Sequence, residues 1–117
     1  MTQEEKELLL KDLCCRLPYG VFVEYDYGDG VKRATKFHGN YLYLMMMGSL
    51  QWKDFKPYLR PISSMTEEEK AELFQLMGNG TDIQRVDFYN AHNFDYRGLI
   101  PMGLALEAPE GMYNVQN

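Results

Sequence analysis

The chain has 117 residues, of which 45% are hydrophobic and 25% charged. These values are ordinary for a globular domain and exclude a wholly disordered chain. Its 17 acidic and 12 basic residues give a net charge of −5, which argues against a protein that binds duplex nucleic acid, because such proteins neutralise phosphates with Lys and Arg. The length suits one domain over residues 1–117. Two His and two Cys are too few for most zinc modules, so we expect no metal and no cofactor.

The first residues and the apolar runs suggest where the protein works. Residues 1–7 are acidic and lack the basic start of a secretory signal. The longest apolar run, residues 41–47, is far too short to cross a membrane. Cys14 and Cys15 are adjacent and cannot easily form a disulfide with each other. We therefore expect buried thiols, no membrane contact and a cytoplasmic location in a bacterial host cell.

A helix is expected over residues 3–17, within a first region of residues 1–18. Thr2 and Glu5 have the spacing of a capping box, in which each side chain accepts a hydrogen bond from a backbone N–H at the helix start. Pro18 ends the helix. The apolar stripe with helical spacing consists of Leu10, Leu13, Cys14 and Leu17.

From residue 19 to residue 55 the apolar period changes to two, which is typical of β-strands. Turn signals at residues 28–30, 39–40 and 48–49 divide this region into four strands. We therefore expect a four-stranded antiparallel β-meander, which can curl towards a small barrel.

The loop lengths fix which residues lie opposite each other, so we expect Val23 opposite Thr35 and Tyr25 opposite Arg33. Residues directly opposite share a face of the sheet. The predicted core face consists of Val21, Val23, Tyr25, Tyr27, Val31, Phe37, Leu42, Leu44, Met46 and Phe55. The predicted outer face consists of Glu24, Asp26, Lys32, Lys36, His38, Tyr41, Tyr43, Met45 and Trp52.

Residues 56–65 are predicted to form a connector, stiffened by two prolines. A second helix follows over residues 67–77, because Thr66 and Glu69 form another capping box. Its predicted buried stripe is Leu73, Phe74 and Met77.

A third helix is expected from a cap at Asp82 to about His92. Its predicted inward residues are Ile83, Val86 and Tyr89. Residues 95–102 are compatible with a short helix that Pro101 breaks. With a helical region over residues 66–117, the chain is predicted to be an α+β domain with two or three C-terminal helices.

Several short segments of the sequence have distinctive residue patterns. These segments are residues 13–21, 56–61, 63–69, 94–100 and 103–113. Together they resemble a family of small hypothetical proteins carried by phages and prophages of anaerobic gut bacteria. The resemblance implies an origin in a mobile genetic element. That family has no assigned activity, so the resemblance implies no functional residues.

His92 and Asp95 are candidates for catalysis, since they lie three residues apart. A nucleophilic mechanism would also need Cys14, Cys15 or a serine beside the imidazole, and the spacing does not require this. We expect His92 and Asp95 to be helix-end and cap residues. A small hydrolase remains an alternative, and it would require a concave site lined by both residues.

Charge is segregated along the chain, because residues 31–60 hold six basic residues and one acidic residue, a balance of +5. On the predicted outer face, aromatic residues stand beside cations. The candidate binding residues are Lys32, Lys36, His38, Tyr41, Tyr43, Met45 and Trp52. Such a surface suits a protein partner, since Tyr, Trp and Met are enriched in interface cores. It also suits single-stranded nucleic acid, through stacking and backbone attraction.

Three alternatives therefore remain for the outer face. The chain's own acidic C-terminal helices can cover it, a protein can bind it, or single-stranded nucleic acid can bind it. We expect a non-enzymatic phage or prophage accessory protein that binds a host or phage protein, or a second copy of itself, through this face. The alternative function is a single-stranded nucleic-acid-binding module that uses the same residues.

Overall fold

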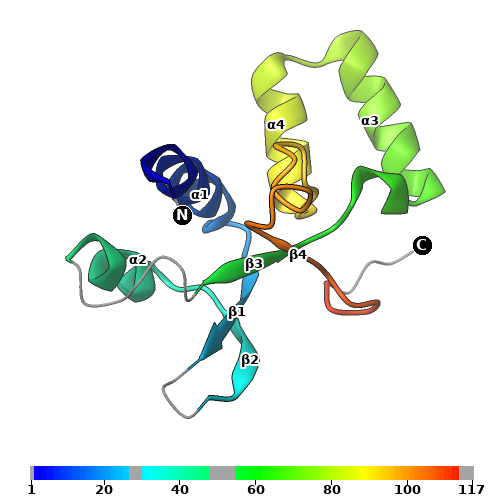
Figure 1. Cartoon of the computed structure of the whole chain (residues 1–117). Helices are drawn as coiled ribbons and strands as arrows, with labels where there is room; N and C mark the ends of the chain where they lie inside the picture. Colours follow the sequence, from blue (N-terminus) through cyan, green and yellow to red (C-terminus); the bar gives the residue numbers. More distant parts are fainter. Residues whose placement is uncertain (1, 27–29, 48–54, 114–117) are drawn as a thin grey trace.

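The computed structural model describes residues 2–26, 30–47 and 55–113, which form a mixed α+β structure. The helices are α1 (Gln3–Arg16), α2 (Gly39–Met46), α3 (Glu67–Asn79) and α4 (Asp82–Ala91), with a short 3₁₀ helix, η2 (Ile62–Ser64). The strands are β1 (Phe22–Asp26), β2 (Lys32–Lys36), β3 (Lys56–Leu59) and β4 (Leu106–Glu107). The molecule is elongated, with extents of 45 × 27 × 25 Å. The α3–α4 hairpin projects from one end, and the β1–β2 hairpin projects from the other (Figure 1).

The four strands form an open, mixed sheet in the order β2-β1-β3-β4. Strand β1 pairs antiparallel with β2 and β3, whereas β3 and β4 are parallel. The first predicted hairpin is confirmed with its register, since Val23 pairs with Thr35 and Tyr25 with Arg33. The prediction of a purely antiparallel meander that curls towards a barrel is wrong.

The predicted third strand is instead helix α2. Residues 41–47 are almost continuously apolar, and a short run of this kind does not distinguish a strand from a helix. Its Leu and Met residues are good helix formers. The missing strand comes from the predicted connector, where β3 pairs with β1 through Val23 and Pro57. Residues 50–54 of the predicted fourth strand lie outside the described residues.

The main core lies between α1, the sheet and the segment around residue 100. Its buried members are Leu9, Leu13, Val21, Val23, Phe37, Phe55, Leu59, Leu99, Leu104 and Ala105. Tyr25 and Leu42 pack against it half-buried, as the predicted core face requires. Val31 is 52% exposed, which differs from its predicted place on the core face. The side chains of Tyr27, Leu44 and Met46 lie outside the described set.

The helix boundaries at residues 3 and 67 are confirmed, with both capping boxes formed. Helix α4 is capped by Thr81 with Gln84, not by Asp82. On α1 the buried stripe is rotated by one position from the predicted one. It consists of Leu9, Asp12, Leu13 and Arg16. Cys14 is therefore exposed and Cys15 half-exposed, so the prediction of buried thiols is wrong, although both are free.

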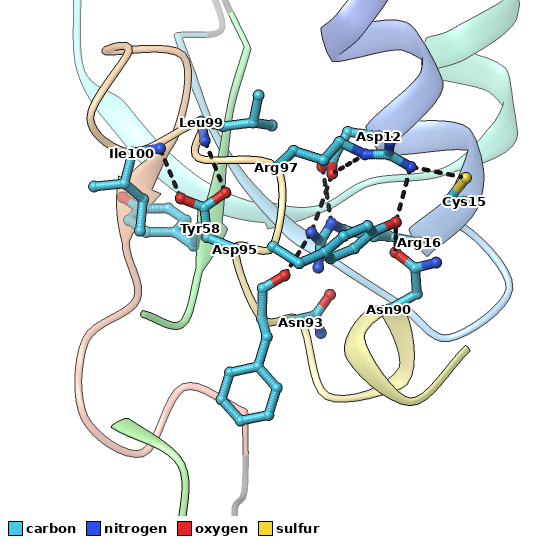
Figure 2. A network of polar contacts seen from close by, with 12 residues as sticks. Asp12, Cys15, Arg16, Tyr58, Asn90, Asn93, Asp95, Arg97, Leu99 and Ile100 are labelled. Carbon is cyan, nitrogen blue, oxygen red and sulfur yellow. Dashed lines mark hydrogen bonds and ion pairs between the residues drawn. The ribbon is translucent and has the colours of Figure 1, made fainter. Parts of the chain in front are cut away.

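The rotation of α1 follows from a buried ion pair that an apolar pattern does not reveal (Figure 2). Asp12 and Arg16 are fully buried, and Arg16 Nε donates to Asp12 Oδ2 over 2.8 Å. Arg16 Nη2 donates to the carbonyl of Phe94 over 2.7 Å, and Arg97 Nε to Asp12 Oδ1 over 3.2 Å. The Tyr96 hydroxyl accepts from Arg97 and donates to Asn90 on α4. This network fastens α1 to α4 and to the segment after it.

Two polar atoms of this region have no hydrogen-bond partner among the described residues, Arg16 Nη1 and Asn93 Oδ1. One is a donor and the other an acceptor. Arg16 donates to the carbonyl of Phe94, and Phe94 directly follows Asn93 in the sequence. Asn93 itself has a φ of 58°, in the left-handed region that Asn tolerates better than most residues.

Candidate functional site

The predicted outer face is not assembled as one surface. Tyr41 and Tyr43 lie two positions apart on helix α2, so they point about 200° apart. Tyr41 is packed near Phe37 and Phe55, with ring centroids 6.1 and 5.9 Å away. Tyr43 is 63% exposed. The side chain of Met45, on the same helix, and Trp52 lie outside the described residues.

The cationic members of the predicted site remain at the surface. Lys32 and Lys36 are exposed on β2, and His38 is exposed just before α2. Lys32 lies 3.8 Å from Glu24 on the neighbouring strand. Of the three alternatives for the outer face, cover by the C-terminal helices is approached at Lys36, which lines a cleft together with Glu68 and Glu72 of α3. The α3–α4 hairpin itself projects from the other end of the molecule (Figure 1).

Among the described residues, the most exposed large apolar side chains lie on the α3–α4 hairpin instead. Phe74 is 78% exposed and Met77 63%, while Ile83 on α4 is 74% exposed and Val86 39%. Phe74, Met77, Ile83 and Val86 were predicted to be buried. The helices pack on each other through a narrower set of residues. The small core at the hairpin base consists of Met65, Phe88 and Phe94, with Leu73, Leu76 and Tyr89 against it.

Helical spacing places the four exposed residues on one side of the hairpin. Phe74 follows the packed Leu73 by one position, and Met77 follows Leu76 by one position. Val86 likewise follows Arg85, which donates to the Leu76 carbonyl and therefore faces α3. Each step turns the side chain by about 100°. Because the helices are right-handed and antiparallel, the three steps lead to the same side. Ile83, three positions before Val86, lies at the outer edge of this side, because three positions correspond to a turn of about 60° further from α3.

We call this surface the hairpin face, defined by Phe74, Met77, Ile83 and Val86. Its surroundings are acidic, since residues 67–91 hold six acidic and two basic side chains, a balance of −4. The two cations are already paired within the hairpin, Lys70 with Glu67 and Arg85 with Asp82. The hairpin therefore presents an apolar surface within an acidic element.

A second feature is a cleft between α3, the end of α4 and the start of β1. At its edge Arg60 makes two hydrogen bonds to the Glu69 carboxylate, both of 2.7 Å. His92 Nδ1 lies 3.0 Å from the same carboxylate, and His92 Nε2 lies 3.7 Å from Glu72. The Arg60 guanidinium also lies over the Phe94 ring, 4.3 Å from its centroid.

The pKa of Glu69 reflects this arrangement. Burial by itself raises the pKa of the carboxyl, but the hydrogen bonds from Arg60 and from the Thr66 backbone outweigh it and lower the pKa to about 2. Glu69 therefore remains ionised over the physiological range. It orients His92 while it caps α3 through Thr66.

The cleft has a volume of about 490 Å³. Glu68, Glu72 and His92 line it on one side, and Tyr19 and Lys36 belong to the chain on another side. Asp95 does not line the cleft. The Asp95 carboxylate instead accepts hydrogen bonds from the backbone N–H groups of Leu99 and Ile100. The cleft is therefore not the concave site lined by both His92 and Asp95 that the hydrolase alternative requires. The predicted helix-end role of His92 is confirmed, because His92 is the C-cap of α4. Asp95 precedes no helix among the described residues and instead holds the turn that contains Leu99 and Ile100.

Sequence reasoning assigned Glu69 only to a capping box, and it assigned Arg60 only to a connector. Neither residue carries a spacing signal that relates it to His92, because their meeting depends on how β3 and α4 pack. The sequence shows only that Arg60 lies between two prolines and shortly before a helix with an acidic start. This pattern does not indicate which carboxylate Arg60 binds.

No protein-family model matches the sequence, and the comparisons with curated proteins and with solved structures give no match. Within residues 2–26, 30–47 and 55–113, no helix is long and apolar enough to cross a membrane. In the same ranges, no group of three or more His, Cys, Asp or Glu residues is placed to hold a metal ion.

Proposed function

We propose that this chain is a non-enzymatic protein-binding module and that the hairpin face is its docking surface. The observation that carries the proposal is the exposure of four large apolar side chains on two neighbouring helices, three on one side of the hairpin and Ile83 at its edge. Single exposed apolar residues are normal, whereas a contiguous patch marks an interaction site. A helical hairpin offers such a patch as ridges that a partner helix can pack against.

The occupant that fits best is another protein that presents an apolar, basic surface. The hairpin carries a balance of −4, so a second copy bound face to face would bring two acidic elements together. A basic partner would instead gain attraction around the apolar contact, which raises both association rate and specificity. A phage or prophage origin and a place in the bacterial cytoplasm belong to the same proposal.

Single-stranded nucleic acid receives less support than it did from the sequence. Stacking requires aromatic faces beside cations. Of the two predicted tyrosines, only Tyr43 is exposed, and it lies on α2 whereas Lys32 and Lys36 lie on β2. The hairpin face, by contrast, is surrounded by the acidic side chains of residues 67–91, which repel phosphate.

The test is affinity capture from the native host with three forms of the tagged chain. These are the natural sequence, the variant Phe74→Asp/Ile83→Asp, and the matched control Tyr43→Asp/Met47→Asp, which changes two exposed apolar residues elsewhere. We expect a protein held by the natural chain and by the control to be lost at least about tenfold from the hairpin variant. Loss with the control and retention by the hairpin variant would contradict the proposal.

A further inference from the structure

The cleft beside His92 shows a separation of charge that the docking surface does not use. Glu68 and Glu72 lie four positions apart on α3, one helical turn, and both line the cleft. Lys36, at the end of β2, lines it from another element. In the described part of the chain no ion pair engages Lys36 or Glu68, and Glu72 approaches only His92, at 3.7 Å. Beside the Arg60–Glu69 pair, Lys36 and the two glutamates therefore line the cleft without pairing with each other.

The stem of Lys36 lies close to the backbone at Gly20. Gly20 has a φ of +88°, and a Cβ atom there would lie 3.5 Å from Lys36 Cε. A Cβ atom at this distance would make an ordinary van der Waals contact with the lysine stem, so Lys36 lies beside Gly20 in the cleft lining. The remaining lining is partly aromatic, with Tyr19, Phe22 and Tyr113. Tyr113 is fixed because its hydroxyl donates to the Tyr58 carbonyl over 2.6 Å and accepts from the Phe22 N–H over 2.9 Å.

We infer that the cleft binds a small zwitterion of the amino-acid or short-peptide class. Its ammonium group would lie against Glu68 and Glu72, and its carboxylate would lie against Lys36. An apolar side chain would contact the aromatic part of the wall. A volume of about 490 Å³ accommodates such a ligand. Hydrogen bonds to charged groups are the stronger kind, so both ends contribute to selection.

This site is independent of the hairpin face. Glu72 precedes the packed Leu73 by one position and Phe74 follows it, so the two side chains point to opposite sides of α3. A ligand in the cleft and a protein on the hairpin face would therefore not compete for the same surface.

The experiment is a calorimetric titration of the full chain with four probes: L-leucine, glycyl-L-leucine, its N-acetyl derivative and its C-terminal amide. We expect a zwitterionic probe to bind, and blocking either end to weaken binding about tenfold or more, since a hydrogen bond to a charged group contributes about 1.5–3 kcal/mol. L-leucine and the dipeptide distinguish a free amino acid from a peptide as the ligand. Equal binding of the blocked and free peptides, or no binding at millimolar concentration, would overturn the inference.

Two pairs of variants locate the site. Glu72→Gln and Lys36→Gln should each weaken binding about tenfold, whereas Glu67→Gln and Lys70→Gln, on exposed α3 positions outside the cleft lining, should leave it unchanged. Phe74→Asp/Ile83→Asp should bind the probe normally, which separates failure of this site from failure of the docking surface. Unchanged binding by Glu72→Gln and Lys36→Gln would place the ligand elsewhere and overturn the inference.

Discussion

At the scale of single residues, the structure depends on charges that are buried only because they are paired. Glu69 accepts two hydrogen bonds from Arg60, lies beside His92 and completes the capping box with Thr66. Asp12 is shared by Arg16 and Arg97 in the same way. A buried charge that loses its partner is costly, so these side chains fix one arrangement of the surrounding elements.

The low pKa of Glu69 predicts how stability changes with acidity. A carboxyl whose pKa is lower in the folded chain than its ordinary 4.5 stabilises the fold above that pH. This stabilisation is lost as the pH falls from about 4.5 towards about 2. Glu69→Gln should therefore lower the free energy of unfolding at pH 7 and flatten its fall in this interval. Urea unfolding at a series of pH values measures both, and an unchanged acid limb in the variant would contradict the assignment.

The Asp12–Arg16 pair gives a second prediction at this scale. Arg16→Met removes one partner of a fully buried pair and should cost about 3–5 kcal/mol of unfolding free energy. Lys11→Met, at an exposed position on the same helix, should change it by less than about 0.5 kcal/mol. Similar effects of the two variants would show that the buried network does not hold α1.

At the scale of elements, the α3–α4 hairpin depends on a tight connection. A Cβ atom at Gly80 would lie 2.7 Å from the Leu76 carbonyl oxygen, whereas one at Gly78 would meet nothing within 4 Å. Gly78→Ala should therefore raise the free energy of unfolding by about 0.5–1 kcal/mol, as expected within a helix. Gly80→Ala should lower it and change the angle between the helices. Thermal unfolding of the two variants compares them directly, and stabilisation by both would contradict this geometry.

The two phenylalanines of the hairpin should also differ. Phe74→Ala should alter the free energy of unfolding by less than about 0.5 kcal/mol because the ring is 78% exposed. Phe88→Ala empties a buried position and should cost about 3–5 kcal/mol. A large cost at Phe74 would mean that this ring is packed inside the fold and not available to a partner.

Much of the local structure was predictable at this scale, because it depends on local chemistry. The capping boxes at Thr2 and Thr66 and the first hairpin register all follow from residues within a few positions of one another. Helix α2 was not predictable, since its apolar run suits either a strand or a helix. The exposure of Phe74 and Ile83 was not predictable either, because a helical pattern shows an apolar side but not whether anything covers it.

At the scale of the whole molecule, the candidate sites lie on different sides of one element. The cleft lies on the side of α3 with Glu72, and the hairpin face lies on the side with Phe74. Sequence reasoning placed the site on the basic segment around Lys32 and Lys36, and it identified the apolar residues of the hairpin only as core. It missed the cleft because Lys36, Glu72 and His92 meet only through the packing of β2, α3 and α4.

The acidic hairpin also predicts a salt dependence. A basic partner should bind the hairpin face more slowly as ionic strength rises, because salt screens the attraction between exposed charges. The association rate measured by surface plasmon resonance should fall between 50 and 500 mM salt, roughly tenfold or more, while the dissociation rate changes less. A rate that does not depend on salt would exclude the proposed charge complementarity.

The most direct test of the docking surface is photo-cross-linking in the native host, with benzoylphenylalanine introduced at one position at a time. The informative positions are Met77 on the hairpin face, Gln75 on the other side of α3, and Tyr43 on α2. We expect a cross-linked protein from position 77 and none from positions 75 and 43. A cross-link from position 43 with none from position 77 would contradict this expectation.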